Sequence, residues 1–262
     1  MVAGAMLSWA QTPDCASLTQ QAFEMSGVNQ QIDQMAQIFS SEDFLRQLEA
    51  NSQDGGKAAS IFTSILRKNL DGPSLKKDLM QRFLTRCSTW QISPAIQEMQ
   101  TDFVARMLKL EADVYTPEGQ ERIQKYARIM QIAPPPDWQL ENADAFDQKA
   151  GITEYTVDYL LAVKRGILTG MGAPPDVVAQ LKEQRKLLKV QIENGILASI
   201  ILTYNGVSKA DLAKYGNELS TGPLRWYFDT VHKSLVEILL ERSTAIGHDI
   251  KDAVLASREA GQ

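Results

Sequence analysis

Apolar residues recur at intervals of three and four along most of the chain, and this spacing limits the possible folds more than any other feature. The longest run has apolar side chains at Ile96, Met99, Phe103, Met107, Leu110 and Val114. A second run lies near the C-terminus, at Leu224, Tyr227, Val231, Leu235 and Ile238. Sustained alternation of apolar and polar residues, the pattern of a strand, is not found. We therefore predict an all-α fold, an antiparallel helical bundle of two related halves.

The size and charge of the chain exclude several classes of protein. It has 262 residues, 44% of them hydrophobic and 23% charged, so it is long enough to bury a core and too apolar to be disordered. Its formal net charge of −5 argues against a nucleic-acid partner, because nucleic-acid-binding domains usually carry excess basic charge. The longest apolar run, Gly195–Tyr204, is about half of the roughly 20 residues that a membrane helix needs, so we expect a protein that does not span a membrane.

Helix starts and one proline-rich stretch divide the chain. Thr12-Pro13, Ser93-Pro94 and Thr116-Pro117 each place a hydroxyl side chain before a proline, which is the pattern of a helix N-terminus. Three prolines at positions 134–136 cannot be helical, and acidic residues follow them, so we predict a semi-rigid connector over residues 133–142. This connector divides the chain into an N-terminal helical half, residues 12–132, and a C-terminal helical half, residues 143–262.

The first eleven residues are similar to part of an export signal. Val2–Ala10 is small and apolar, and Ser8 and Ala10 suit signal-peptidase cleavage before Gln11. A basic n-region is missing, so residues 1–11 are interpreted either as the remnant of a signal peptide or as a frayed terminus. The first interpretation predicts a periplasmic or secreted protein, and the second leaves a cytoplasmic protein open.

Cys15 and Cys87 are the two cysteines of the chain. Cys15 shares a helical stripe with Leu18 and Ala22, and Cys87 follows Phe83 at a step of four, so both side chains are expected to face inward. In an exported protein we expect them to form a disulfide, because disulfides persist in oxidising compartments. In a reducing compartment they would remain two buried thiols.

Two turns indicate that the halves are related. Tyr115–Gly119 leads into a helix that contains Tyr126, and Glu218–Gly222 leads into Arg225-Trp226-Tyr227, so we predict an internal repeat. The sequence also resembles a family of uncharacterised Gram-negative bacterial proteins that is catalogued as a domain of unknown function. The resemblance lies in an aromatic residue, a Ser/Thr turn with glycine and then a helix with aromatic residues. The segments that carry the resemblance are Tyr115–Gly119 and Ser220–Tyr227. The resemblance implies an exported, all-helical protein, and it implies no activity.

No pattern of catalytic or metal-binding residues is recognisable in the sequence. His232 and His248 are sixteen residues apart, so they do not share the helix face that a two-histidine zinc site needs. His232 is expected at the solvent edge, and Glu111, Glu118 and Glu121 are interpreted as part of a solvated helix face. We therefore expect no catalytic residue, no cofactor and no metal site that the sequence can identify.

Two further clusters also have structural explanations. Gly166, Gly170 and Gly172 follow an apolar helix and are interpreted as its end, since no strand precedes them as a nucleotide-binding loop requires. The six basic residues between Arg67 and Cys87 are interpreted as a charged helix face. A patch for an anionic lipid or polymer is the alternative.

Trp226, Tyr227 and Phe228 form the candidate interaction surface. Three consecutive aromatic residues cannot all face one way on a helix, since successive side chains are about 100° apart. At least one of them points away from the main stripe, and it either lines a cleft, contacts the other half or meets a partner chain.

These observations favour a non-catalytic exported protein that binds an apolar ligand or a partner protein. A cell-envelope hydrolase with unrecognised carboxylates is an alternative, and it requires two carboxyl groups close together in a cleft. A cytosolic helical scaffold with buried thiols is a second alternative.

Overall fold

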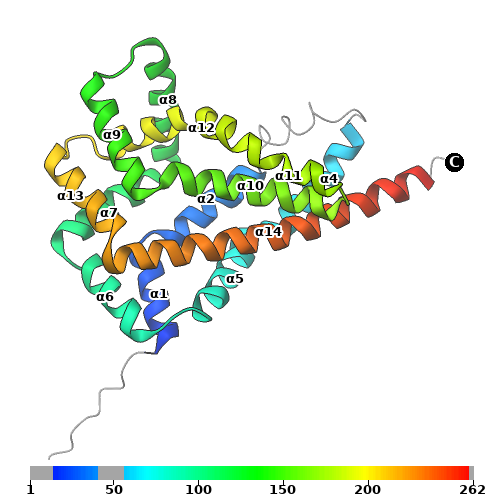
Figure 1. The fold of residues 1–262 in the computed structure, drawn as a ribbon, viewed down its shortest axis with the longest axis horizontal. Helices are drawn as coiled ribbons and strands as arrows, with labels where there is room; N and C mark the ends of the chain where they lie inside the picture. The colour runs from blue at the N-terminus through cyan, green and yellow to red at the C-terminus, as the bar shows by residue number, and fades with distance from the viewer. Residues whose placement is uncertain (1–13, 41–55, 260–262) are drawn as a thin grey trace, which may run out of the picture.

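The structure, a computed structural model, describes residues 14–40 and 56–259 (Figure 1). Every regular element in those residues is an α-helix, which confirms the predicted all-α class. The first half contains α1 (Cys15–Met25), α2 (Val28–Ser40), α4 (Gly56–Asn69), α5 (Gly72–Leu84), α6 (Thr89–Met99), α7 (Asp102–Val114) and α8 (Pro117–Ile132). The second contains α9 (Asp137–Ala150), α10 (Ile152–Gly170), α11 (Pro175–Ala179), α12 (Leu181–Thr203), α13 (Lys209–Ser220) and α14 (Gly222–Glu259).

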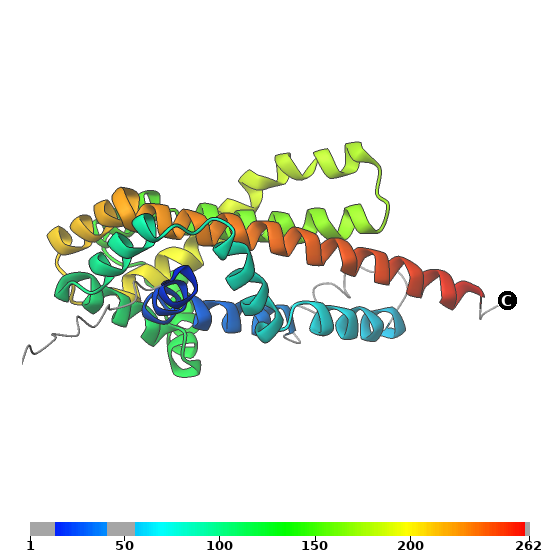
Figure 2. The ribbon, with the colours of Figure 1, turned by 90° about the horizontal axis from the view of Figure 1, so that it is seen from below.

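The long helix α14 packs against helices from both halves of the chain. It has 38 residues, which at 1.5 Å per residue makes it about 57 Å long. The predicted C-terminal stripe is buried along one face, at Leu224, Tyr227, Val231, Leu235 and Ile238. Helix α10 packs along α14, and α4, α5 and α6 pack against it from the first half. Figure 2 shows the hairpin of α10 and α12 on one side of α14 and α4 on the other.

The arrangement of the helices is only partly antiparallel. Helices α10 and α14 run parallel, because their contacts advance together, from Tyr155 against Asp229 to Gly170 against Gly247. Their parallel course is possible because α11, α12 and α13 carry the chain back between them. Helices α5 and α14 run antiparallel, since Arg86 bonds to Ser234 while Asp78 bonds to Arg242.

Glycines bring the backbones of α10 and α14 into contact. A Cβ atom on Gly170 would lie 2.1 Å from the Thr244 carbonyl oxygen, and one on Gly247 would lie 2.3 Å from the Ile167 carbonyl oxygen. Gly170 is the last residue of α10, as predicted for a helix end, whereas Gly166 lies one turn earlier, inside the helix at this crossing. Gly172 does lie in the following turn, where its φ of 81° favours glycine.

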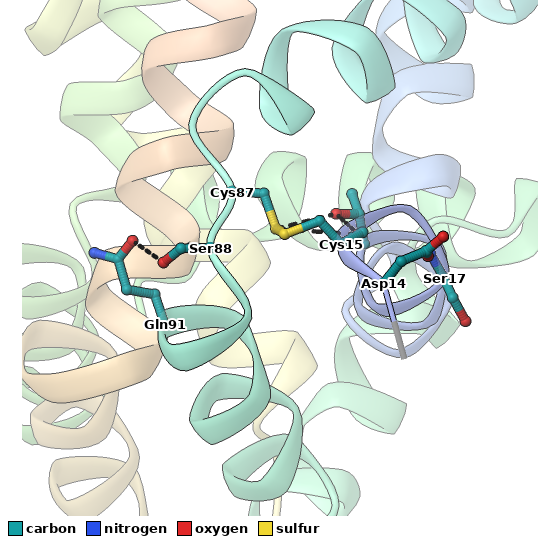
Figure 3. Close-up of a disulfide and its surroundings, with 7 residues drawn as sticks. Asp14, Cys15, Ser17, Cys87, Ser88 and Gln91 are labelled. Carbon is teal, nitrogen blue, oxygen red and sulfur yellow. Dashed lines mark hydrogen bonds between the residues drawn. A yellow bond between two sulfur atoms is a disulfide. The ribbon is translucent and has the colours of Figure 1, made fainter. Parts of the chain in front are cut away.

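A disulfide joins Cys15, the first residue of α1, to Cys87 in the turn between α5 and α6 (Figure 3). The two Cα atoms are 6.1 Å apart. The Thr19 hydroxyl donates to the Cys15 carbonyl oxygen, at 2.6 Å, which ties the pair to the next turn of α1. The disulfide predicted for an exported protein is therefore present in the structure, and the described residues contain no free thiol.

One core joins the two halves of the chain. Phe23 and Phe83 from the first half contact Tyr227 of α14, with ring centroids 6.5 and 5.7 Å from it. The Tyr227 and Ser26 hydroxyls are hydrogen-bonded at 2.6 Å. The halves therefore share their packing. Across the described residues, the helices are too short or too polar to cross a membrane.

Two helix boundaries differ from the sequence prediction. Pro94 lies inside α6 rather than at a helix start, because α6 already begins at Thr89. The apolar stripe of residues 96–114 spans two helices rather than one, since the Thr101 hydroxyl caps α7 by accepting from the Val104 N–H. By contrast, Thr116 caps α8 as predicted, accepting from the Gly119 N–H at 3.0 Å. Thr12 and Pro13 lie outside the described residues, as does the candidate signal remnant at residues 1–11.

The connector between the halves is shorter than the sequence predicts. Residues 133–136 are irregular, and α9 already begins at Asp137. The acidic stretch is helical because Asp137 lies in the first turn of α9, where a carboxylate stabilises the positive end of the helix dipole.

Candidate functional site

A cavity of about 440 Å³ lies where helices from both halves of the chain converge. Its lining comes from α2, α7 and α8 of the first half and from α9, α10, α12, α13 and α14 of the second. This volume falls within the range of small-molecule binding sites. A second, more open depression of about 550 Å³ lies between α2, α4 and α5, and charged, polar and apolar side chains line it together.

The walls of the cavity are mainly apolar and aromatic. Aromatic rings line it at Tyr115, Phe146, Tyr155, Tyr159, Tyr204 and Phe228. Aliphatic side chains and one thioether line it at Met35, Val114, Ile123, Ala150, Ile152, Leu160, Ile196, Ile200, Leu219 and Val231. Uncharged polar side chains also line it, at Ser26, Gln31, Gln34, Gln120, Thr156, Ser199 and Thr203. Such a surface favours an apolar ligand, because burying apolar area contributes about 25 cal/mol per Å².

Glu111 supplies the one carboxyl group among the lining residues that the structure describes. Its Oε1 atom accepts a hydrogen bond of 2.5 Å from the hydroxyl of Tyr204, the C-cap residue of α12. The hydroxyl of the neighbouring Tyr215 is completely buried and has no hydrogen-bond partner among the described residues. Phenol groups therefore surround the carboxyl.

Burial raises the pKa of the Glu111 carboxyl above its usual range, and the neighbouring phenols of Tyr204 and Tyr215 lower it in part. Burial also raises the pKa of the hydroxyl of Tyr204, and the Glu111 charge adds to that effect. The same two causes raise the pKa of Tyr115. These phenols consequently stay protonated, and the Tyr204 hydroxyl donates its hydrogen bond to the carboxyl.

The sequence places Glu111 inside the molecule through the register of α7. Glu111 follows Met107 by four residues and Leu108 by three, and both of those side chains are buried. The interpretation of Glu111 as part of a solvated face is therefore wrong, whereas Glu118 and Glu121 are exposed as expected. The sequence could have indicated this position, because Glu111 lies on the same helix face as the apolar Met107 and Leu108.

A second polar group, here called the histidine cluster, joins α10, α12 and α14. His232 Nε2 lies 3.0 Å from the Asp158 carboxylate, and the His232 ring stacks on Tyr155 with centroids 4.0 Å apart. Arg185 of α12 bonds to Asp158 at 2.5 Å and also to Glu154. The cluster therefore ties the three helices together next to the cavity wall that Tyr155 forms.

The expectation that His232 lies at the solvent edge is wrong. Its residue surface is 9% exposed, and its Nδ1 atom is buried without a hydrogen-bond partner. Burial lowers the pKa of His232, and the Asp158 hydrogen bond opposes this effect. The neutral ring is therefore favoured, with its proton on Nε2, where the Asp158 carboxylate accepts it.

The three aromatic residues of the candidate interaction surface point in different directions. Tyr227 is completely buried, and Trp226 packs edge-on against Phe83 with centroids 5.9 Å apart. Phe228 lines the cavity. As the 100° step of a helix requires, they form no continuous exposed surface. Phe228 is the member that contributes to the candidate site.

The basic residues between Arg67 and Cys87 include several that pair with carboxylates. Arg82 and Arg86 bond to Glu237 of α14, and Lys76 bonds to Asp33 of α2. These pairs agree with the charged-face interpretation, in which the basic side chains hold α5 against its neighbours.

The described residues contain no cluster of metal-ligating side chains, and the cavity holds a single carboxyl group. Glu98 and Glu218 form one pair of neighbouring carboxyl groups. Burial is the main cause of the raised pKa of Glu98, and the nearby charge of Glu218 raises it further. Neither residue lines the cavity. The geometry of the cavity therefore suits binding better than two-carboxylate hydrolysis, which needs both groups in one cleft.

Comparisons with known proteins add no relative. No protein-family model matches the sequence. No curated protein and no solved structure is significantly similar to it.

Proposed function

We propose that this chain is a non-catalytic binding protein that encloses a small apolar ligand in the cavity beside Glu111. The observation that carries this proposal is the combination of volume and lining. Apolar and aromatic side chains from both halves enclose about 440 Å³, and a few polar groups converge there, which is the usual composition of a ligand site. Binding of a partner protein at an exposed aromatic surface is less well supported, because Tyr227 is buried.

We also propose that the protein works in an oxidising compartment, the periplasm or the extracellular space. The Cys15–Cys87 disulfide supports this location, since such bonds persist outside the reducing cytosol. A cytosolic scaffold with buried thiols is less consistent with the paired cysteines.

Native mass spectrometry of the protein purified from its own host tests both proposals. We expect a mass two daltons below that of the dithiol form under denaturing conditions, and an extra mass under native conditions that an organic solvent extracts. A reduced chain would contradict the oxidising location. A protein that carries no extractable mass would contradict the proposal that it binds a ligand.

A matched pair of variants on α9 assigns the extra mass to the cavity. Ala150 lines the cavity, so Ala150→Phe should fill it and remove the bound mass. Ala145 lies on the same helix and is exposed, so Ala145→Phe should retain the ligand. Retention by both variants would place the ligand elsewhere and overturn the proposal.

A further inference from the structure

The cavity contains an acid without a basic partner in its walls. Glu111 is the one carboxyl group in the lining that the structure describes, and that lining includes no lysine, arginine or histidine. The hydrogen bond to Glu111 comes from the neutral phenol of Tyr204. A carboxylate in an enclosed site is costly unless a positive charge or several hydrogen bonds balance it. The cavity walls therefore supply no positive charge to Glu111.

We infer that the ligand is an apolar molecule that carries an ammonium group, which pairs with Glu111 while its apolar part fills the aromatic cavity. This inference rests on the proposed function and adds the chemical class of the head group. The ammonium group would supply the charge that the protein walls do not.

The aromatic lining supports a cationic head group independently of the carboxyl. Tyr115 and Tyr204 both line the cavity, and their electrostatic coupling to Glu111 indicates that they are near it. The Phe146 ring lies edge-on to Tyr204, with centroids 5.0 Å apart. Aromatic faces attract cations, and a carboxylate among tyrosine rings is well suited to amines, including fully alkylated ones.

The same features disfavour the two other common amphiphiles. A fatty acid would place a second carboxyl group near Glu111, and because two like charges at close range cannot both remain ionised, its binding near neutral pH would require the uptake of a proton. A fatty alcohol can donate one hydrogen bond to Glu111 but leaves its charge unbalanced. The groups that face Glu111 are the phenols of Tyr115, Tyr204 and Tyr215, and none of them supplies a positive charge.

Isothermal titration calorimetry with three probes of equal chain length tests the inference. Decyltrimethylammonium, decan-1-ol and decanoate are each titrated below their micelle concentrations, near neutral pH. Decyltrimethylammonium is useful because its charge does not change with pH. We expect it to bind at least tenfold more tightly than decan-1-ol, and decanoate to bind most weakly.

Three variants identify the group responsible. Glu111→Gln should remove the preference for the ammonium probe, whereas Tyr204→Phe, which keeps the carboxyl, should retain it. Ala150→Phe should abolish binding of all three probes. Circular dichroism checks that each variant is folded.

The outcomes separate the inference from the function on which it rests. Equal binding of the ammonium and alcohol probes, or an unchanged preference in Glu111→Gln, would overturn the amine head group while leaving an apolar ligand site. Ammonium binding that persists in Ala150→Phe would place the site outside the cavity and overturn the inference. Failure of all three probes to bind would overturn the proposed function as well.

Discussion

The Tyr204 hydroxyl donates a 2.5 Å hydrogen bond to Glu111, although the two residues are 93 positions apart in the sequence. Tyr204 caps the end of α12 in the second half of the chain, and Glu111 lies in α7 of the first. The bond therefore links the halves at the wall of the cavity. It also lowers in part the pKa that burial of the Glu111 carboxyl raises.

The first prediction concerns the pH dependence of stability. Burial raises the pKa of Glu111 in the folded state above its usual value of about 4.5. As pH rises, the Glu111 carboxyl therefore ionises first in the unfolded chain. The free energy of unfolding should therefore fall as pH rises through the raised pKa. Glu111→Gln should lessen this fall in urea-unfolding curves recorded from pH 4 to 8.

Glu98 and Glu218 also have raised pKa values, mainly through burial. They should therefore also lower the free energy of unfolding as pH rises. Both residues are present in the wild type and in Glu111→Gln, so the difference between the two curves isolates Glu111. Parallel curves would contradict a raised pKa for this group.

The second prediction concerns the disulfide. Cys15 and Cys87 are 72 residues apart, and closing a loop of this length stabilises a protein by about 4 kcal/mol in the chain-entropy model. Reduction should therefore lower the urea midpoint of the wild type. The double variant Cys15→Ser, Cys87→Ser should have the lower midpoint with or without reductant. If mass spectrometry confirms reduction, a wild-type urea midpoint that does not change with reductant would contradict the prediction.

The third prediction concerns the crossing of α10 and α14. Gly170→Ala should destabilise the protein by about 1–3 kcal/mol or more, since the new methyl group would overlap the Thr244 carbonyl oxygen. Gly195 provides the matched control, because it lies in α12 and a Cβ there meets nothing within 4 Å. Gly195→Ala should stabilise by about 0.5–1 kcal/mol through helix propensity. Similar effects at both sites in thermal unfolding would contradict the close crossing.

The fourth prediction concerns His232. Burial lowers its pKa below the usual 6.5, so the unfolded chain binds a proton first as pH falls. The stability that neutral His232 contributes is present above pH 6.5 and is lost as pH falls through the lowered pKa. An NMR titration of His248→Gln, in which His232 is the remaining histidine, should give a midpoint below 6.5. A midpoint above 6.5 would mean that Asp158 outweighs burial.

The helical class and much of the core were predictable because they depend on local spacing. The stripe from Leu224 to Ile238 needs no knowledge of distant residues, and neither does the Thr116 cap of α8. The break at Thr101 was missed because the apolar spacing of three and four continues across it. The parallel course of α10 and α14 was missed because it depends on glycine contacts between residues far apart in the sequence.

The cavity could not be predicted in the same way. Its walls combine side chains from most of the helices, and sequence spacing does not reveal which ones meet. Phe228 was named as part of a candidate interaction surface, and the lining of a cleft was one alternative for these aromatic residues, but the sequence did not identify which residue would do so. Glu111 was assigned to solvent because Glu118 and Glu121 nearby suggested a charged face, although its own position on α7 pointed inward.

The central claim is that the cavity beside Glu111 holds an apolar ligand. Titration with the fluorescent probe N-phenyl-1-naphthylamine, of the wild type, Ala150→Phe and Ala145→Phe, tests it most directly. The account predicts saturable fluorescence enhancement at one site in the wild type and in Ala145→Phe, and none in Ala150→Phe. Equal enhancement in all three proteins, or none in the wild type, would contradict it.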